Sequence, residues 1–114
     1  MNAHAPPPLP EPRPLPGLKQ LALFLDLDGT LAAIKPRPGD VGPEAWRTGL
    51  LEQLQDRLEG RLAVISGRSL EEGDRILDGA VAAVAAVHGL VRRHADGTVE
   101  QAPPAEGLAD ARAR

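Results

Sequence analysis

A short, uninterrupted run of apolar residues from Leu21 to Leu25 constrains the fold of this chain more than any other feature. Turn-forming residues follow at Gly29 and Thr30, so the run has the length of a strand rather than of a helix. A strand that is apolar at every position is buried on both faces, which is typical of a parallel sheet covered by helices. A second run of this kind spans 62–65 and ends at Ser66.

The residues between these two runs predict a loop over 32–42 and then a helix. Pro43 suits the first position of a helix, and Gly60 suits its end. Apolar residues recur in this segment at a spacing of four, which predicts one buried stripe on the helix. We expect that stripe to consist of Trp46, Leu50, Leu54 and Leu58, with Leu51 beside them.

A second helix is predicted from Ser69 to about Leu77, because Ser69 and Glu72 have the spacing of a capping box and Gly79 follows. The apolar segment 81–87 is short and predicts a third strand. Segments 90–93 and 98–101 flank Asp96-Gly97, which predicts a hairpin. This order of strands and helices indicates an α/β fold: a partial Rossmann-like parallel sheet with right-handed crossovers.

Composition excludes several classes of protein. The chain of 114 residues has a net charge of −3, which gives no electrostatic basis for binding nucleic acid. It has no cysteine, so disulfides and thiolate zinc sites are excluded. No apolar run approaches membrane-spanning length, and the start lacks the pattern of a signal peptide. We therefore expect a cytoplasmic protein that binds neither nucleic acid nor membrane. Residues 1–17 are rich in proline and predict an extended tail.

Two carboxylates follow the first predicted strand directly. Asp26 and Asp28 are two positions apart, so both side chains point to the same side if the strand stays extended. Open α/β sheets place their active sites at this end of the strands. A carboxylate there can attack phosphorus, hold a metal ion or move a proton, and Gly29 lets backbone amides approach a phosphate.

The segment Asp26-Leu27-Asp28-Gly29-Thr30-Leu31 resembles the first motif of the haloacid-dehalogenase-like phosphatase superfamily, and Val64-Ile65-Ser66-Gly67-Arg68 resembles its second motif. Within that superfamily the chain is most similar to the trehalose-6-phosphate phosphatases. The similarity rests on the order and spacing, over about 20–105, of Ala33-Ile34-Lys35-Pro36-Arg37-Pro38, the second motif, Val87-His88-Gly89-Leu90 and Arg92-Arg93.

The resemblance implies a role for each matching residue. Asp26 corresponds to the nucleophile and a Mg²⁺ ligand. Asp28 corresponds to the acid/base and, through its backbone carbonyl, to a second ligand, and Ser66 corresponds to a donor to the transferred phosphoryl group. The resemblance also implies contacts of a sugar-phosphate substrate with Gly67, Arg68, Lys35 and His88. From the residues alone, Arg68, Lys35 and His88 are equally well explained as an ordinary surface arginine, loop lysine and strand-end histidine.

Three parts of such an enzyme have no counterpart in the sequence: the lysine of the third motif, the acidic pair of the fourth, and the cap domain. The resemblance therefore implies an N-terminal fragment. Residues 18–102 would form part of the phosphatase core, and 103–114 would begin the cap region. We expect little or no turnover from the 114-residue chain alone. Two alternatives stay open: another sugar phosphatase of the superfamily, such as one acting on sucrose phosphate, or a non-catalytic remnant that binds phosphate or a partner.

Overall fold

The computed structural model describes residues 5–14 and 17–103. One mixed sheet has the strand order β1-β2-β3-β4-β5. The parallel part comprises β1 (Leu23–Asp26), β2 (Leu62–Ile65) and β3 (Ala83–Ala86). The antiparallel part adds β4 (Val91–Arg93) and β5 (Val99–Gln101). The helices are α1 (Ala45–Arg57) and α2 (Leu70–Leu77), with 3₁₀ turns at η1 (Leu18–Gln20), η2 (Pro38–Asp40) and η3 (Val87–Gly89).

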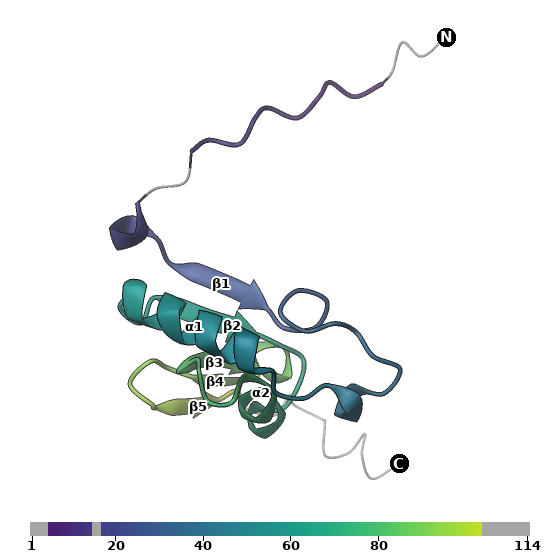
Figure 1. Ribbon diagram of the computed structural model, residues 1–114, viewed down its shortest axis with the longest axis vertical. Coiled ribbons are helices and arrows are strands. Elements are labelled where there is room, and N and C mark those ends of the chain that lie inside the picture. Colours follow the sequence, from purple (N-terminus) through teal and green to yellow (C-terminus); the bar gives the residue numbers. More distant parts are fainter. Residues whose placement is uncertain (1–4, 15–16, 104–114) are drawn as a thin grey trace.

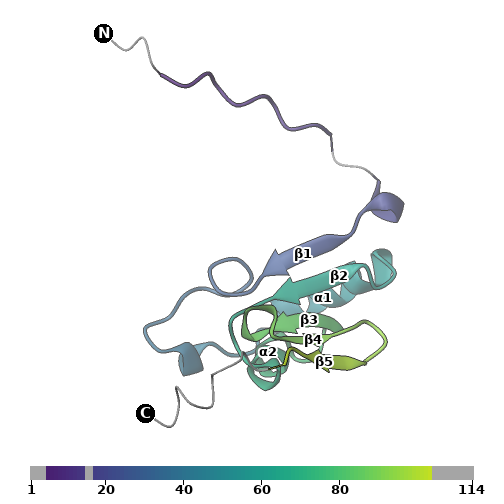
Figure 2. The same cartoon turned by 180° about the vertical axis from the view of Figure 1, so that it is seen from behind.

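Both α-helices lie on the same face of the sheet, as the two opposite views show (Figure 1, Figure 2). The alternation of side chains along each strand follows from this arrangement. In β2, Leu62 and Val64 are buried beneath the helices, whereas Ile65 is exposed on the other face. Phe24 of β1 is likewise exposed. The predicted strands are confirmed, but burial on both faces does not hold for β1, which is an edge strand within the described residues.

The predicted stripe on α1 is wrong in part. Trp46 and Leu50, expected in the core, are 64% and 48% exposed. The helix buries the expected Leu51 and, just past its end, Leu58, together with Arg47, which was not expected in the core. Rotation of the helix toward Arg47 has a physical reason, because the Arg47 guanidinium donates hydrogen bonds to three backbone carbonyls in the interior. The helix also begins later than predicted, at Ala45 with Glu44 as its N-cap.

The start and end of α2 agree with the sequence prediction except in one detail. The Ser69 hydroxyl accepts a hydrogen bond from the Glu72 backbone N–H at 3.1 Å, which caps the helix. The Glu72 carboxylate does not reach back to complete a capping box; it accepts hydrogen bonds from Arg75 instead. At the other end, Asp78 and Gly79 both have positive φ and turn the chain toward β3.

The β4–β5 hairpin is joined to α2 by a bidentate ion pair. Arg93 donates to both carboxylate oxygens of Asp74 at 2.7 and 2.8 Å, and to the carbonyls of Val81 and Ala82. Hydrogen bonding to Asp74 raises the pKa of Arg93 above its ordinary value. The antiparallel pairing of β4 with β5 confirms the hairpin predicted around Asp96-Gly97.

The described N-terminal segment has no regular secondary structure. Residues 5–14 contain no helix or strand and are exposed. The predicted start of a cap region lies outside the described residues from 104 onward. Within 5–14 and 17–103, no helix combines the length and the apolar character needed to cross a bilayer.

Candidate active site

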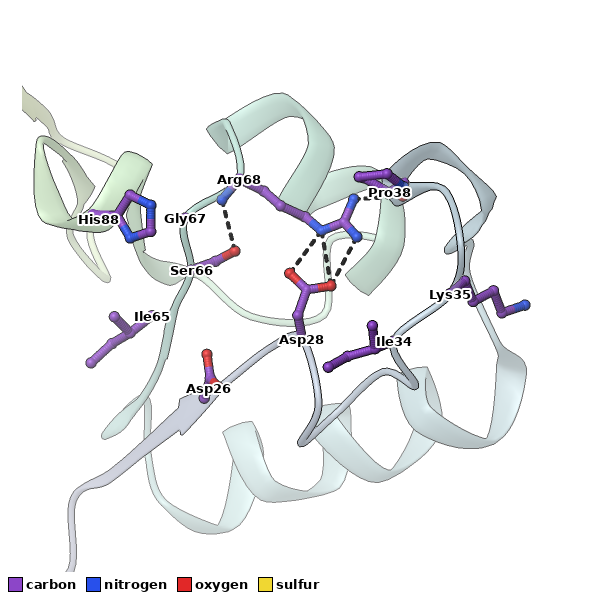
Figure 3. A pocket seen from close by; sticks show the side chains of 10 residues that line it. All are labelled: Asp26, Asp28, Ile34, Lys35, Pro38, Ile65, Ser66, Gly67, Arg68 and His88. Carbon is purple, nitrogen blue, oxygen red and sulfur yellow. Dashed lines mark hydrogen bonds and ion pairs between the residues drawn. The ribbon is translucent and has the colours of Figure 1, made fainter.

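The register of the parallel strands brings the two sequence motifs together. Asp26 is paired with Ile65, and Ile65 with Ala85, so β1, β2 and β3 end side by side. The loops that leave these ends enclose an open pocket of about 520 Å³. It is lined by Asp26, Asp28, Ile34, Lys35, Pro38, Ile65, Ser66, Gly67, Arg68 and His88, which are drawn in Figure 3. All seven predicted site residues thus border one pocket.

Asp26 is the last residue of β1, and its carboxylate is exposed toward the pocket (Figure 3). One oxygen, Oδ1, accepts a hydrogen bond from the backbone N–H of Leu27 at 3.0 Å, which fixes the orientation of the group. The next side chain, Leu27, is fully buried and anchors the strand end in the core. The carboxylate is therefore held by its own backbone and remains open to an incoming group.

The chain turns sharply after Asp28. Three consecutive backbone N–H groups, those of Thr30, Leu31 and Ala32, donate to the Leu27 carbonyl, and Gly29 donates to the Ala32 carbonyl at 2.8 Å. Gly29 has φ +85°, a conformation that favours glycine, so it permits the close turn. The expected approach of its backbone amides to a phosphate is not borne out, because the N–H groups of residues 29–32 donate within the turn. This tight turn points the Asp28 carboxylate back over the pocket.

Arg68 holds the Asp28 carboxylate from the opposite side of the pocket. Its Nη2 and Nε atoms donate to Oδ1 and Oδ2 at 2.8 and 2.9 Å, a bidentate pair between residues 40 apart in the chain (Figure 3). Arg68 Nη1 also donates to the Pro38 carbonyl at 2.8 Å and lies 3.5 Å from Glu72. Arg68 thereby connects the first motif, η2 and the start of α2.

This contact has a clear electrostatic consequence. Hydrogen bonding and the positive charge of Arg68 lower the pKa of Asp28 below its ordinary value, and desolvation opposes them only in part. Asp28 is therefore an ionised carboxylate at neutral pH in the free protein. An ionised carboxylate can act as a general base. To act as a general acid, Asp28 must first gain a proton.

Replacing Arg68 with glutamine is expected to raise the pKa of Asp28 toward the ordinary aspartate value. A lowered pKa in the folded state contributes stability that is present above the unfolded pKa of about 3.9 and is lost as pH falls through the folded pKa. The Arg68→Gln variant should therefore lose this contribution to the free energy of unfolding at neutral pH. Carboxyl ¹³C NMR titration in magnesium-free buffer measures the pKa. The matched control is Arg92→Gln, which removes an exposed partner of Glu100; an equal pKa of Asp28 in all three proteins would contradict the assignment.

Ser66 follows β2 and is only 5% exposed. Its Oγ accepts a hydrogen bond from the Arg68 backbone N–H at 3.0 Å, and its own N–H donates to the Ala85 carbonyl of β3. Because the oxygen already accepts that bond, its hydroxyl proton is available to donate into the pocket. A buried hydroxyl fixed in this way is suited to hold an oxyanion.

The remaining predicted residues lie at the rim. The Lys35 side chain extends away from the pocket, with its ammonium pointing outward (Figure 3). His88 lies on the Gly67 side of the pocket, at the end of β3. Three residues not predicted for the site also line the pocket: Pro38, whose carbonyl accepts a hydrogen bond from Arg68, and Ile34 and Ile65, which add apolar walls. No sequence signal marks the Pro38 backbone carbonyl as a contact of Arg68. Ile65 could have been placed at the site, because it directly precedes Ser66.

The pocket offers oxygen ligands of the kind that a magnesium ion prefers. Among residues 5–14 and 17–103, no three histidine, cysteine or acidic side chains gather in one place. Asp26 nevertheless offers an exposed carboxylate, and the resemblance implies the backbone carbonyl of Asp28 as the second ligand, since both Asp28 carboxylate oxygens accept hydrogen bonds from Arg68. Mg²⁺ is commonly held by one or two carboxylates, with water and substrate phosphate as the other ligands. These two residues would hold the ion.

Comparisons with known proteins identify the family of this chain. The sequence profile of the trehalose-phosphatase family matches residues 24–110. A probable trehalose-phosphate phosphatase of Sinorhizobium fredii is 38% identical over 85 residues, covering 75% of this chain and 32% of that protein. The trehalose-6-phosphate phosphatase of Escherichia coli K12 is 46% identical over 77 residues, covering 67% of this chain and 29% of that protein. The chain thus spans about a third of the length of these relatives.

A solved structure supports the fold. The structure of BT1666 from Bacteroides thetaiotaomicron, a phosphatase of the haloalkanoate (HAD) superfamily, aligns with a TM-score of 0.59 at 20% identity. The alignment covers 89% of this chain and 37% of the other. Both motifs that border the pocket fall within the residues that the family profile matches. The chain belongs to the trehalose-phosphatase family.

Proposed function

We propose that this chain forms the phosphoryl-transfer part of a magnesium-dependent trehalose-6-phosphate phosphatase. The observation that supports this most directly is the meeting of an open carboxylate, Asp26, with the buried hydroxyl of Ser66 and the Asp28–Arg68 pair in one pocket. Choice of trehalose 6-phosphate as the substrate rests on the names of the two curated relatives.

In the first step, a carboxylate oxygen of Asp26 attacks the phosphorus of the sugar phosphate. The bond between phosphorus and the sugar oxygen breaks, and Asp28, once protonated, gives its proton to that oxygen. The products are trehalose and an aspartyl phosphate on Asp26. The hydroxyl of Ser66 donates a hydrogen bond to a phosphoryl oxygen and helps to hold the phosphoryl group in line with Asp26.

In the second step, Asp28 is again a carboxylate and takes a proton from water. The water oxygen attacks phosphorus, the bond to Asp26 breaks, and inorganic phosphate leaves. The ionised state that Arg68 favours for Asp28 suits this step. A bound magnesium ion would neutralise the negative charge that Asp26, Asp28 and the phosphate bring together.

Complete turnover needs more than these residues. The lysine and the acidic pair that the superfamily resemblance implies have no match in the 114 residues. We therefore expect phosphate release from trehalose 6-phosphate by this chain to stay near background. The half-reaction that Asp26 performs should still be accessible to a small, activated phosphoryl donor.

The experiment that tests the proposal is phosphorylation by acetyl phosphate in magnesium buffer. We expect intact mass spectrometry to find one added phosphoryl group, and peptide mapping to place it on Asp26. Hydroxylamine should remove the group, because it cleaves acyl phosphates. Absence of an adduct, or an adduct on another residue, would contradict the proposal. Rapid phosphate release from trehalose 6-phosphate would instead contradict the expected dependence on the missing residues.

A further inference from the structure

The turn that follows β3 has an unusual backbone. Val87 has φ +49° and His88 has φ +54°, and Gly89 follows at +88°. A β-branched residue such as valine rarely adopts positive φ, because its side chain collides with its own backbone there. Conformations of this kind are unfavourable and occur where surrounding contacts enforce them, often at functional sites.

The contacts that enforce this turn come from the second motif. The Val87 N–H donates to the Arg68 carbonyl at 2.8 Å, and the His88 N–H donates to the Ser66 carbonyl at 3.0 Å. These two bonds hold the backbone on either side of Gly67. The strained turn and the second motif therefore form one rigid unit at the edge of the pocket.

Gly67 itself accommodates the His88 side chain. A Cβ atom placed on Gly67 would lie 2.6 Å from His88 Nε2 and closer still to Cε1, so the imidazole occupies the space that any other residue would fill. The Gly67 backbone has no positive φ, so this close contact, and not its conformation, is the reason for glycine. Within the described residues, no hydrogen bond engages either ring nitrogen of His88.

We infer that Gly67 and the strained turn are a positioning device that presents the His88 imidazole to a phosphoryl oxygen of the substrate. The inference rests on the proposed function and adds to it a fixed donor on the Ser66 side, opposite Arg68. A neutral imidazole has one N–H to donate, and its ring here borders the pocket that contains Asp26 and Ser66. The glycine is required because the ring takes the place of its side chain.

The test measures binding of inorganic phosphate to the 114-residue chain in magnesium buffer at pH 7.5, by the shifts of the Gly67 and Ser66 amides in NMR spectra. His88→Asn removes the ring but keeps a residue that tolerates positive φ. We expect it to weaken phosphate binding about tenfold, as for loss of one hydrogen bond to a charged group. The control His94→Asn removes an exposed histidine that contacts Glu100, and it should bind like wild type.

Gly67→Ala gives an independent variant, since the added methyl should push the imidazole aside without unfolding the chain. We expect it to weaken binding as His88→Asn does, and to add little to the loss when both changes are combined. Equal affinity of wild type and His88→Asn, an equal loss in His94→Asn, or fully additive losses would overturn the inference while the proposed function stands. If wild type binds no phosphate, the proposed phosphoryl site itself fails and the inference fails with it.

Discussion

Asp26→Asn is expected to abolish formation of the phosphorylated chain. Asparagine has nearly the same shape as aspartate and can still accept the hydrogen bond from the Leu27 N–H, so the end of β1 should be preserved. Its amide oxygen is a far weaker nucleophile than a carboxylate. Removal of a catalytic nucleophile typically costs several orders of magnitude in rate, and we expect a loss of at least about a thousandfold. The measurement is the rate of adduct formation with acetyl phosphate.

The matched control for this variant is Asp40→Asn. Asp40 is an exposed aspartate in η2, close in sequence to the site but outside the residues that line the pocket. We expect it to form the adduct at the wild-type rate, because loss of a negative charge alone should not matter. A slow rate in both variants would indicate a general electrostatic effect, and an unchanged rate in Asp26→Asn would exclude Asp26 as the nucleophile.

The position of the site was predictable because strand ends and charges leave strong signals in a sequence. An apolar run that ends at two carboxylates predicts where β1 ends, and the same reasoning places Ser66 after β2. Parallel pairing then brings the two motifs to one edge, as the register of Asp26 with Ile65 confirms. The pairing of Asp28 with Arg68 could not be derived, because it depends on rotamers of residues 40 apart.

Two features had no readable signal. Positive φ at Val87 contradicts the local preference of valine, and only the bonds to the carbonyls of the second motif explain it. The orientation of α1 was mispredicted for a related reason. The spacing of Trp46 and Leu50 suggested a buried stripe. A pattern of apolar residues carries no information about the hydrogen bonds that Arg47 makes inside the protein. Both features depend on polar contacts between segments distant in sequence.

Arg47→Met is expected to lower the free energy of unfolding by about 3 kcal/mol. Arg47 is 2% exposed and donates to the carbonyls of Leu31, Gly42 and Ile76 at 3.3, 2.7 and 2.9 Å. Methionine fills a similar space but donates nothing, so three carbonyls lose a partner. Removal of a buried charge, with its unpaired Nε, offsets part of this loss.

Arg57→Met is the matched control, since it makes the same change at an exposed position of the same helix. Urea and thermal unfolding followed by circular dichroism measure both variants. For a domain of this size, the loss should lower the Tm of Arg47→Met by more than about 10 °C, with little change in the control. The Arg47 bonds hold the loop after Asp28 against α1 and α2, so the effect should extend to the pocket: the adduct on Asp26 should form more slowly even well below the Tm. Wild-type stability in Arg47→Met would show that this loop is held by its apolar contacts alone.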